Sequence, residues 1–272
     1  MEKLEKLKKE VMVLAATIIC GATTFTSCTN DDNPATPDLG VKEKIIGKWM
    51  FYDRNGELTP TNKKRVFTFV SSTKAYVSAA HSMESAEWFD HTEAAVAIDG
   101  NKVTLTMQTD EHTAMVDEFD ITAISSSEFT ARLKVTAIVD GIEERVSENN
   151  IRLTKVTADY TAAILGLWEC QGITGGETNN DDNARLEFLA DGTYNVYRRS
   201  DAGVWSLVPR ERNEYFVDGS LLCTRWQAEG EQMSYEWWEI TSAADGHMQW
   251  TALRQQADGT TFQQGVAWKR VE

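Results

Sequence analysis

The chain has few of the residues that usually identify an enzyme or a nucleic-acid-binding protein. Its 272 residues include only 4 histidines and 4 cysteines, and 27 basic residues stand against 42 acidic ones. The net charge of −15 argues against a nucleic-acid partner, because phosphate binding requires a basic face. Proline is also scarce, at 4 residues, so most of the chain is expected to fold.

No motif with known chemistry involves the histidines. The zinc-protease pattern His-Glu-x-x-His and the serine-hydrolase pattern Gly-x-Ser-x-Gly are both missing. Carboxylates are numerous, but no spacing singles out a catalytic pair. We therefore expect no enzyme activity, no cofactor and no metal site. A metal held by His81, His91 and His112 is the weaker alternative.

The longest apolar run is too short to cross a membrane. Residues 11–20 are apolar apart from Thr17, whereas a spanning helix needs about 20 residues. Four lysines precede the run, and small polar residues follow it up to Ser27. This order is typical of a targeting segment that is removed, and not of a folded element.

Residues 25–28, Phe-Thr-Ser-Cys, resemble the lipobox of bacterial lipoproteins, with phenylalanine in place of the usual leucine. The resemblance implies a signal peptide at 1–27 and a membrane anchor of acyl chains on Cys28. An ordinary cleavage site followed by a free cysteine is the alternative.

Residues 28–42 are acidic and polar and read as a tether. Asp31 and Asp32 in this segment resemble the surface-export signal of Bacteroidetes lipoproteins, although a plain solvated tether explains them equally well. The expected location is the outer membrane, on its periplasmic face or at the cell surface.

Two matched segments make up the rest of the chain. Ile-Ile-Gly-Lys-Trp at 45–49 opens the first segment, and Ile-Leu-Gly-Leu-Trp at 164–168 opens the second. Each closes on a basic, apolar, strand-like run, at 152–156 and 267–271. Matched beginnings and ends indicate a tandem duplication. We predict one domain at 43–156 and another at 164–272, joined by a linker at 157–163.

Turn signals divide both segments into short runs rich in β-branched and aromatic residues. Asn-Gly and Asp-Gly dipeptides, which favour two-residue hairpins, recur throughout. Helical structure is expected only as short turns at 41–46 and 160–165. The pattern predicts an all-β fold of two small antiparallel up-and-down β-barrels, because closure removes exposed sheet edges. A pair of β-sandwiches is the alternative.

Gly-x-Trp at the first strand, a meander and a basic residue in the last strand together resemble the lipocalin-like (calycin) barrels. In that family the tryptophan closes one end of the barrel and a basic side chain packs across it, as a cation–π contact. The resemblance assigns this structural motif to Gly47 and Trp49 in the first domain and to Gly166, Trp168 and Arg270 in the second. The basic partner in the first domain stays open between Lys155 and Arg152.

Tryptophan and cysteine are concentrated in the second domain. It holds Cys170 and Cys223, for which two buried thiols are favoured over a disulfide across the interior. It also holds seven of the nine tryptophans. Adjacent Trp237 and Trp238 must point to opposite faces if they lie on a strand.

We predict a small-ligand site in the second domain, because an apolar pocket with a few polar groups is the usual form of such a site. Trp226, Tyr235 and Trp237 are its predicted wall, and Arg225 is the orienting donor. Strand alternation leaves open which face is inside, since Trp238 and Ile240 offer an equally apolar face.

The sequence therefore predicts a membrane-anchored, non-enzymatic lipoprotein that binds a small apolar ligand or a glycan. The alternative is a structural or adhesive surface protein with filled barrels and no small-molecule ligand. No feature of the sequence indicates an oligomeric state.

Overall fold

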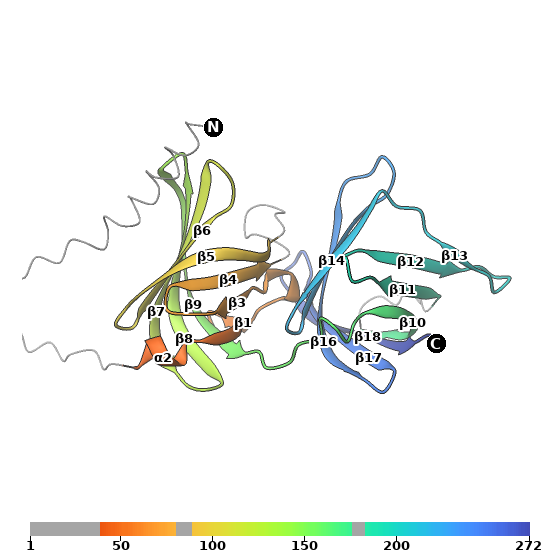
Figure 1. Ribbon diagram of the computed structural model, residues 1–272, viewed down its shortest axis with the longest axis horizontal. Coiled ribbons are helices and arrows are strands. Elements are labelled where there is room, and N and C mark those ends of the chain that lie inside the picture. Colours follow the sequence, from red (N-terminus) through yellow and green to blue (C-terminus); the bar gives the residue numbers. More distant parts are fainter. Residues whose placement is uncertain (1–38, 80–88, 176–182) are drawn as a thin grey trace, which may run out of the picture. The chain divides into compact units, whose positions relative to one another are not determined.

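The computed structural model describes residues 39–79, 89–175 and 183–272 (Figure 1). The predicted signal peptide, lipidated Cys28 and most of the tether lie outside the described residues, as does His81. Residues 38–272 form one compact unit. Helical structure in the described part is limited to short elements such as α2 (Val41–Lys44) and the 3₁₀ turn η1 (Thr61–Lys63). Neither is long enough to cross a membrane, and the described residues hold no other helix that could.

The first sheet is a closed antiparallel barrel. Its strands are β1 (Gly47–Arg54), β2 (Glu57–Leu58), β3 (Val66–Phe69), β4 (Lys74–Ala79), β5 (Phe89–Asp99), β6 (Lys102–Gln108), β7 (Thr113–Ile124), β8 (Glu128–Val139) and β9 (Ile142–Lys155). Strands β3 to β9 follow one another in sequence order, and β1 pairs with both β3 and β9. The β1–β9 ladder closes the barrel, with Trp49 opposite Lys155. The short β2 only extends β1 as a hairpin.

The second sheet curls in the same way but is not closed by a ladder. Its strands are β10 (Gly166–Thr174), β11 (Ala184–Phe188), β12 (Tyr194–Arg199), β13 (Trp205–Leu207), β14 (Arg212–Asp218), β15 (Leu221–Gln227), β16 (Ser234–Ala244), β17 (His247–Gln255) and β18 (Thr261–Arg270). The sheet order runs from β13 at one edge to β14 at the other.

The outer edge of β12 explains why this sheet stays open. Its far part, at Tyr197 to Arg199, is taken up by β13. Among the described residues, this edge is joined to β14 not by a ladder but by an isolated bridge from Thr193, just before β12, to Glu214. The fold prediction of two antiparallel barrel domains is thus confirmed, with a half-barrel where a closed second barrel was expected.

The predicted hairpin turns have the backbone that Asn-Gly and Asp-Gly sequences favour. In the β1–β2 turn, Asn55 has φ 53° and Gly56 has φ 84°. In the β8–β9 turn, Asp140 has φ 51° and Gly141 has φ 79°. Positive φ at both central residues matches the twist of the flanking strands, so these dipeptides set the strand ends.

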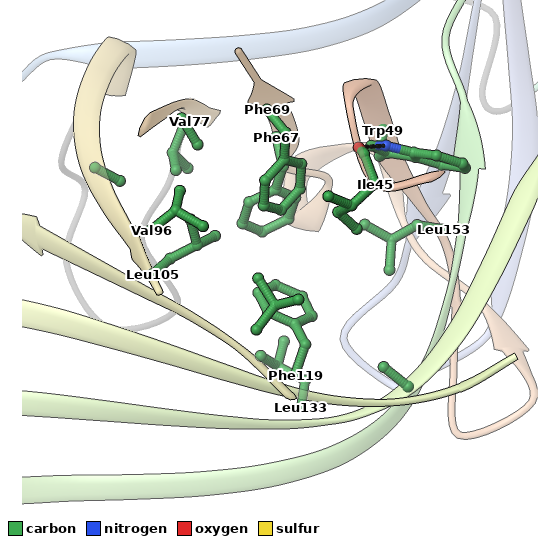
Figure 2. Close-up of a cluster of buried hydrophobic side chains, with 14 of the residues drawn as sticks. Ile45, Trp49, Phe67, Phe69, Val77, Val96, Leu105, Phe119, Leu133 and Leu153 are labelled. Carbon is green, nitrogen blue, oxygen red and sulfur yellow. Dashed lines mark hydrogen bonds between the residues drawn. The ribbon is translucent and has the colours of Figure 1, made fainter. Parts of the chain in front are cut away.

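Each sheet encloses its own apolar core on alternate positions of its strands. The core of the first barrel is built from phenylalanine and aliphatic residues, with Trp49 at one end (Figure 2). Phe67 makes edge-on contacts with Phe51 and with Phe119, each at a ring distance of 5.4 Å. The core of the second sheet is richer in large aromatics: Trp168, Phe188, Tyr194, Trp238, Trp250 and Trp268.

A third apolar cluster forms from outward-facing residues of both sheets. Met50 and Val66 of the first barrel cluster there with Phe216, Leu221 and Cys223 of the second sheet. Close to it, Lys48 Nζ lies 2.5 Å from the fully buried carboxylate of Asp218, and Lys64 Nζ lies 2.7 Å from Glu239.

The cysteines of the second sheet lie on opposite faces. Cys170 is in the core and Cys223 is in the third cluster, and both are buried thiols that form no disulfide, as favoured from the sequence.

Candidate functional site

The Gly-x-Trp motif closes one end of each sheet. In the second sheet, Trp168 Nε1 donates a hydrogen bond of 2.6 Å to the carbonyl oxygen of Ile164. The Arg270 guanidinium lies 4.2 Å from the centre of the Trp168 ring, which is cation–π geometry. Arg270 also donates to the carbonyl oxygens of Leu165 and Ala163, at 2.7 and 3.0 Å. The pairing of Trp168 with Arg270 has the expected geometry.

The first barrel repeats this arrangement with a lysine. Trp49 Nε1 donates to the carbonyl oxygen of Ile45 at 2.6 Å (Figure 2), and Lys155 Nζ lies 4.9 Å from the centre of the Trp49 ring. Arg152, the other candidate from the sequence, instead bonds Asp53 at 2.6 Å. The structure therefore selects Lys155 as the basic partner.

The glycine of each motif is required by the basic side chain that crosses it. Gly47 has φ 122° and Gly166 has φ 109°, which disfavours any residue with a Cβ. A Cβ would lie 2.8 Å from Lys155 Cε at the first position and 2.6 Å from Arg270 Nη1 at the second. Glycine, tryptophan and the basic residue are thus one packed unit that seals this end, so a ligand could enter only elsewhere.

The structure divides the four predicted site residues between two faces. Trp226 alternates with Leu222 of the core and faces inward. Trp237 packs in the third cluster on the outer face, and the Tyr235 ring stacks on it at 6.4 Å. Arg225, opposite Tyr235 in the ladder, is ion-paired with Glu214 on that outer face. Trp238 lies in the core, so the predicted opposition of Trp237 and Trp238 is confirmed.

On the inner face, Trp226 belongs to a polar cluster at the end away from Trp168. The Arg210 guanidinium lies 5.0 Å from the centre of the Trp226 ring. Arg210 Nη1 also approaches the Tyr194 hydroxyl at 3.4 Å and Asn213 Oδ1 at 3.2 Å. Arginine and tryptophan here hold each other in place, with further donors and acceptors beside them.

A second arginine–tryptophan pair lies on the same face. The Arg254 guanidinium is 4.4 Å from the centre of the Trp238 ring. Arg254 Nη2 donates to Glu236 Oε2 at 2.6 Å, and its Nε donates to Gln264 Oε1 at 3.0 Å. We call Tyr194, Arg210, Asn213, Trp226, Glu236, Trp238, Arg254 and Gln264 the inner polar layer.

Burial shifts the pKa values of two groups in the inner polar layer. It raises the pKa of Tyr194 to about 12, although the nearby positive charge of Arg210 opposes the shift. Burial also lowers the pKa of Arg210. The Tyr194 phenol is therefore protonated at neutral pH, where it can both donate and accept a hydrogen bond.

The aromatic core beneath this layer contains two buried donors that lack an acceptor. Trp250 and Trp268 are 3% and 5% exposed, and their rings lie 4.7 Å apart. The Nε1 group of each is buried without a hydrogen-bond partner among the described residues. An unsatisfied buried N–H is costly, so an acceptor that reached either group would stabilise the folded state.

The histidines do not build a metal site in the part of the chain that the structure describes. His91 Nδ1 lies 2.9 Å from Asp90, and His112 Nδ1 lies 2.7 Å from Asp140. Within that part, no group of three or more histidine, cysteine or acidic side chains could hold a metal ion.

Sequence reasoning missed most of the inner polar layer. Arg210 and Asn213 lie at the open edge of the sheet, where no motif marks them. Glu236 and Arg254 could have been found by following the face of Trp238 along neighbouring strands, because residues two apart share a face.

No protein-family model and no curated protein matches the chain. Among solved structures, it is similar to a double mutant of transferrin-binding protein B from Haemophilus parasuis, at 13% identity and a TM-score of 0.24. That match covers 84% of this chain but only 45% of the other.

Two smaller proteins are also similar. A protein of unknown function from the DUF3598 family of Nostoc punctiforme matches at 10% identity and a TM-score of 0.22, covering 86% of this chain and 99% of its own. A protein of Bacteroides fragilis, described as a candidate outer membrane protein, matches at 11% identity and a TM-score of 0.22. This match covers 84% of this chain and 99% of the other. At these values the matches assign no family and carry no functional argument.

Proposed function

We propose that the protein is a non-enzymatic binding module and that the second sheet holds a small ligand against its inner face. The observation that carries this proposal is the inner polar layer. Arg210 on Trp226 and Arg254 on Trp238 place fixed donors beside aromatic surface, above an apolar floor. Aromatic walls with a few fixed polar groups are the usual composition of a small-ligand site.

The chemistry of this layer favours a ligand with an apolar or ring-shaped body and several acceptor oxygens. Its donors include two guanidinium groups and the Tyr194 hydroxyl, and the indole N–H groups of Trp250 and Trp268 lie beneath them. An oxygenated apolar molecule or a glycan meets this description, because the rings offer stacking surface and the donors fix orientation.

Ligand binding can be tested by intrinsic fluorescence against fatty acids, sterols, haem and glycans. We expect a saturable change in the native protein, and an affinity lower by about tenfold or more in Trp226→Leu and in Arg210→Gln. Trp205→Leu is the matched control, because Trp205 packs against Arg185, which pairs with Glu169 away from the core. Binding lost in Trp237→Leu but kept in Trp226→Leu would move the site to the outer face.

We further propose that Cys28 anchors the protein to the outer membrane, on its periplasmic face or at the cell surface. The order of basic, apolar and small residues before Cys28 supports this proposal. Labelled fatty acid should enter the native protein and not Cys28→Ala. Equal labelling of both, or no labelling of the native protein, would contradict the anchor.

The second candidate function is a structural or adhesive surface protein. The observation that favours it is the first barrel, where phenylalanine and aliphatic side chains occupy the interior from Trp49 to Phe119 (Figure 2). If no compound of the panel binds, and Trp226→Leu and Arg210→Gln melt like the native protein, the adhesive role becomes the better explanation.

A further inference from the structure

The binding proposal does not use the edge of the second sheet at β13. This strand pairs with β12 on one side and is the last strand of the sheet on the other (Figure 1). The first barrel instead closes through the β1–β9 ladder, and closure removes the edges of a sheet. An open edge presents backbone N–H and C=O groups that can pair with a strand of another chain.

The hydrogen bonds of the β12–β13 hairpin show which backbone groups face this edge. Val208 N donates to the carbonyl oxygen of Val196 on β12, at 2.8 Å. Successive residues of a strand direct their backbone groups to opposite sides, so those of Leu207 and Trp205 face away from β12. No strand of the described residues pairs with that side of β13. Two N–H and C=O pairs are thus available to a further strand.

The side chains of this edge are uncharged and mostly apolar. Residues 203–209 read Gly-Val-Trp-Ser-Leu-Val-Pro, without a charged residue, although 25% of the chain is charged. Val204 and Leu207 are 60% and 55% exposed. Natural edge strands are usually protected from pairing by charges, by bulges or by being short. At three residues β13 is short but uncharged, so it limits the strength of pairing without preventing it.

The edge is ordered before any partner arrives. The Arg185 guanidinium lies 4.2 Å from the centre of the Trp205 ring, and Arg185 Nε donates to Glu169 Oε2 at 2.7 Å. The Arg199 guanidinium lies 5.9 Å from the same ring centre. On the opposite face, Val208 packs against the core of the second sheet. Pairing therefore costs little conformational entropy, which favours association.

We propose that β13 is a self-association surface, at which two copies of the chain pair antiparallel about a two-fold axis at Ser206. Trp205 of each copy then lies opposite Leu207 of the partner subunit, with backbone groups of both directed at each other. Each such pair forms two backbone hydrogen bonds. Val204 lies opposite Val208 of the partner subunit, so apolar side chains meet apolar side chains throughout.

A second copy suits this edge because the segment is complementary to itself. A two-fold axis requires one surface patch to match its own copy, and the order Val-Trp-Ser-Leu-Val does so in antiparallel register. The chain has a net charge of −15, so two copies repel each other, and an uncharged edge lets them approach. A contact this small is far below a standard interface of about 1,600 Å², so we expect a reversible dimer with a micromolar dissociation constant.

Sedimentation velocity of the purified full chain tests the proposal between about 1 and about 300 µM. We expect a reversible monomer–dimer equilibrium. Leu207→Pro should weaken it about tenfold or more, because it removes an N–H group that each pairing needs. The β12–β13 ladder should survive this change, since proline is tolerated where the N–H faces outward.

Leu207→Lys is the second variant, and it decides the test if Leu207→Pro does not fold. It adds a charge to the edge without altering the backbone, and it should also weaken association about tenfold or more. Leu58→Lys is the matched control. Leu58 is a 53% exposed leucine on the two-residue strand β2 of the first barrel, and its replacement should leave the dimer unchanged.

A pair of introduced thiols tests the register. In the proposed dimer the two copies of Ser206 form a non-hydrogen-bonded pair with Cα atoms about 4.5 Å apart, which is within reach of a disulfide. Ser206→Cys should therefore cross-link two chains under mild oxidation, in a background with Cys20 and Cys28 replaced by serine. Ala202→Cys is the control, because antiparallel pairing places its two copies at opposite ends of the paired segment.

Several results would overturn the proposal. A chain that stays monomeric up to about 300 µM does not use this edge for a second copy. Association as strong in folded Leu207→Pro or Leu207→Lys as in the native protein would place the contact elsewhere. Equal cross-linking of Ser206→Cys and Ala202→Cys would contradict the register. Trp226→Leu should dimerise like the native protein, because the surface is independent of the inner polar layer.

Discussion

The two sheets share one end and differ at the other. Both place a tryptophan under a basic side chain and a positive-φ glycine beside it, and both bond the indole to a carbonyl oxygen four residues earlier. Beyond that end, the first sheet closes completely around a phenylalanine-rich core. The second stays open around a tryptophan core with polar residues on its inner face.

This difference shows what the shared motif controls. It fixes the register where the first and last long strands of each sheet meet, with Trp49 opposite Lys155 and Trp168 opposite Arg270. It does not control whether the remaining strands complete a ladder. The two sheets thus share the structure of the sealed end, while the residues at the opposite end differ between them.

The largest effect is expected from removing either tryptophan. Trp49→Ala and Trp168→Ala should each lower the free energy of unfolding by about 3–5 kcal/mol, because each deletes a buried aromatic and leaves its basic partner without a ring. Urea unfolding followed by circular dichroism measures both. Trp205→Ala should cost less than about 1 kcal/mol, as expected for a residue outside the cores. If one of these two substitutions leaves the free energy of unfolding unchanged, only the other sheet depends on the motif for its stability.

A smaller loss of stability, confined to high pH, is expected from Tyr194 in the second sheet. Its pKa, raised by burial to about 12, means that the folded protein keeps a proton that the unfolded chain releases near pH 10. The associated stability is fully present below about pH 10 and is lost as pH rises through about 12, by about 3 kcal/mol in total.

Urea unfolding at about pH 8 and about pH 11 tests the Tyr194 prediction. The native protein should lose stability between the two, and Tyr194→Phe should lose less because it has no phenol to ionise. An equal loss in both proteins would assign the effect to other groups.

Much of the fold could be predicted because its signals are local. Asn55-Gly56 and Asp140-Gly141 require positive φ values that few residues other than glycine, asparagine and aspartate adopt readily, so they fix turns wherever they occur. The opening of the second sheet has no such signal. It depends on β13 taking the edge of β12, which is a competition between two pairings distant in sequence.

The candidate site was predicted less well, for a related reason. Strand alternation identifies two faces of β16 but not which one is inside. Tyr235 and Trp237 look like a ligand wall in sequence, yet their face is outward, and Trp237 is partly buried there by packing in the third cluster. Trp226 falls on the inner face, and its partner Arg210 lies 16 residues earlier in sequence, outside any strand.

The smallest effect is expected from exchanging the basic residues of the two ends. Arg270 donates to two carbonyl oxygens, at 2.7 and 3.0 Å, whereas Lys155 donates to one, at 3.1 Å. Arg270→Lys should therefore lower the free energy of unfolding by about 1 kcal/mol, the value of one hydrogen bond. Lys155→Arg should be neutral or slightly stabilising, because arginine interacts more favourably with the indole face.

Urea unfolding of both variants beside the native protein measures the difference. Equal losses would show that each end is fitted to its own side chain, while no loss in either would show that charge alone is required.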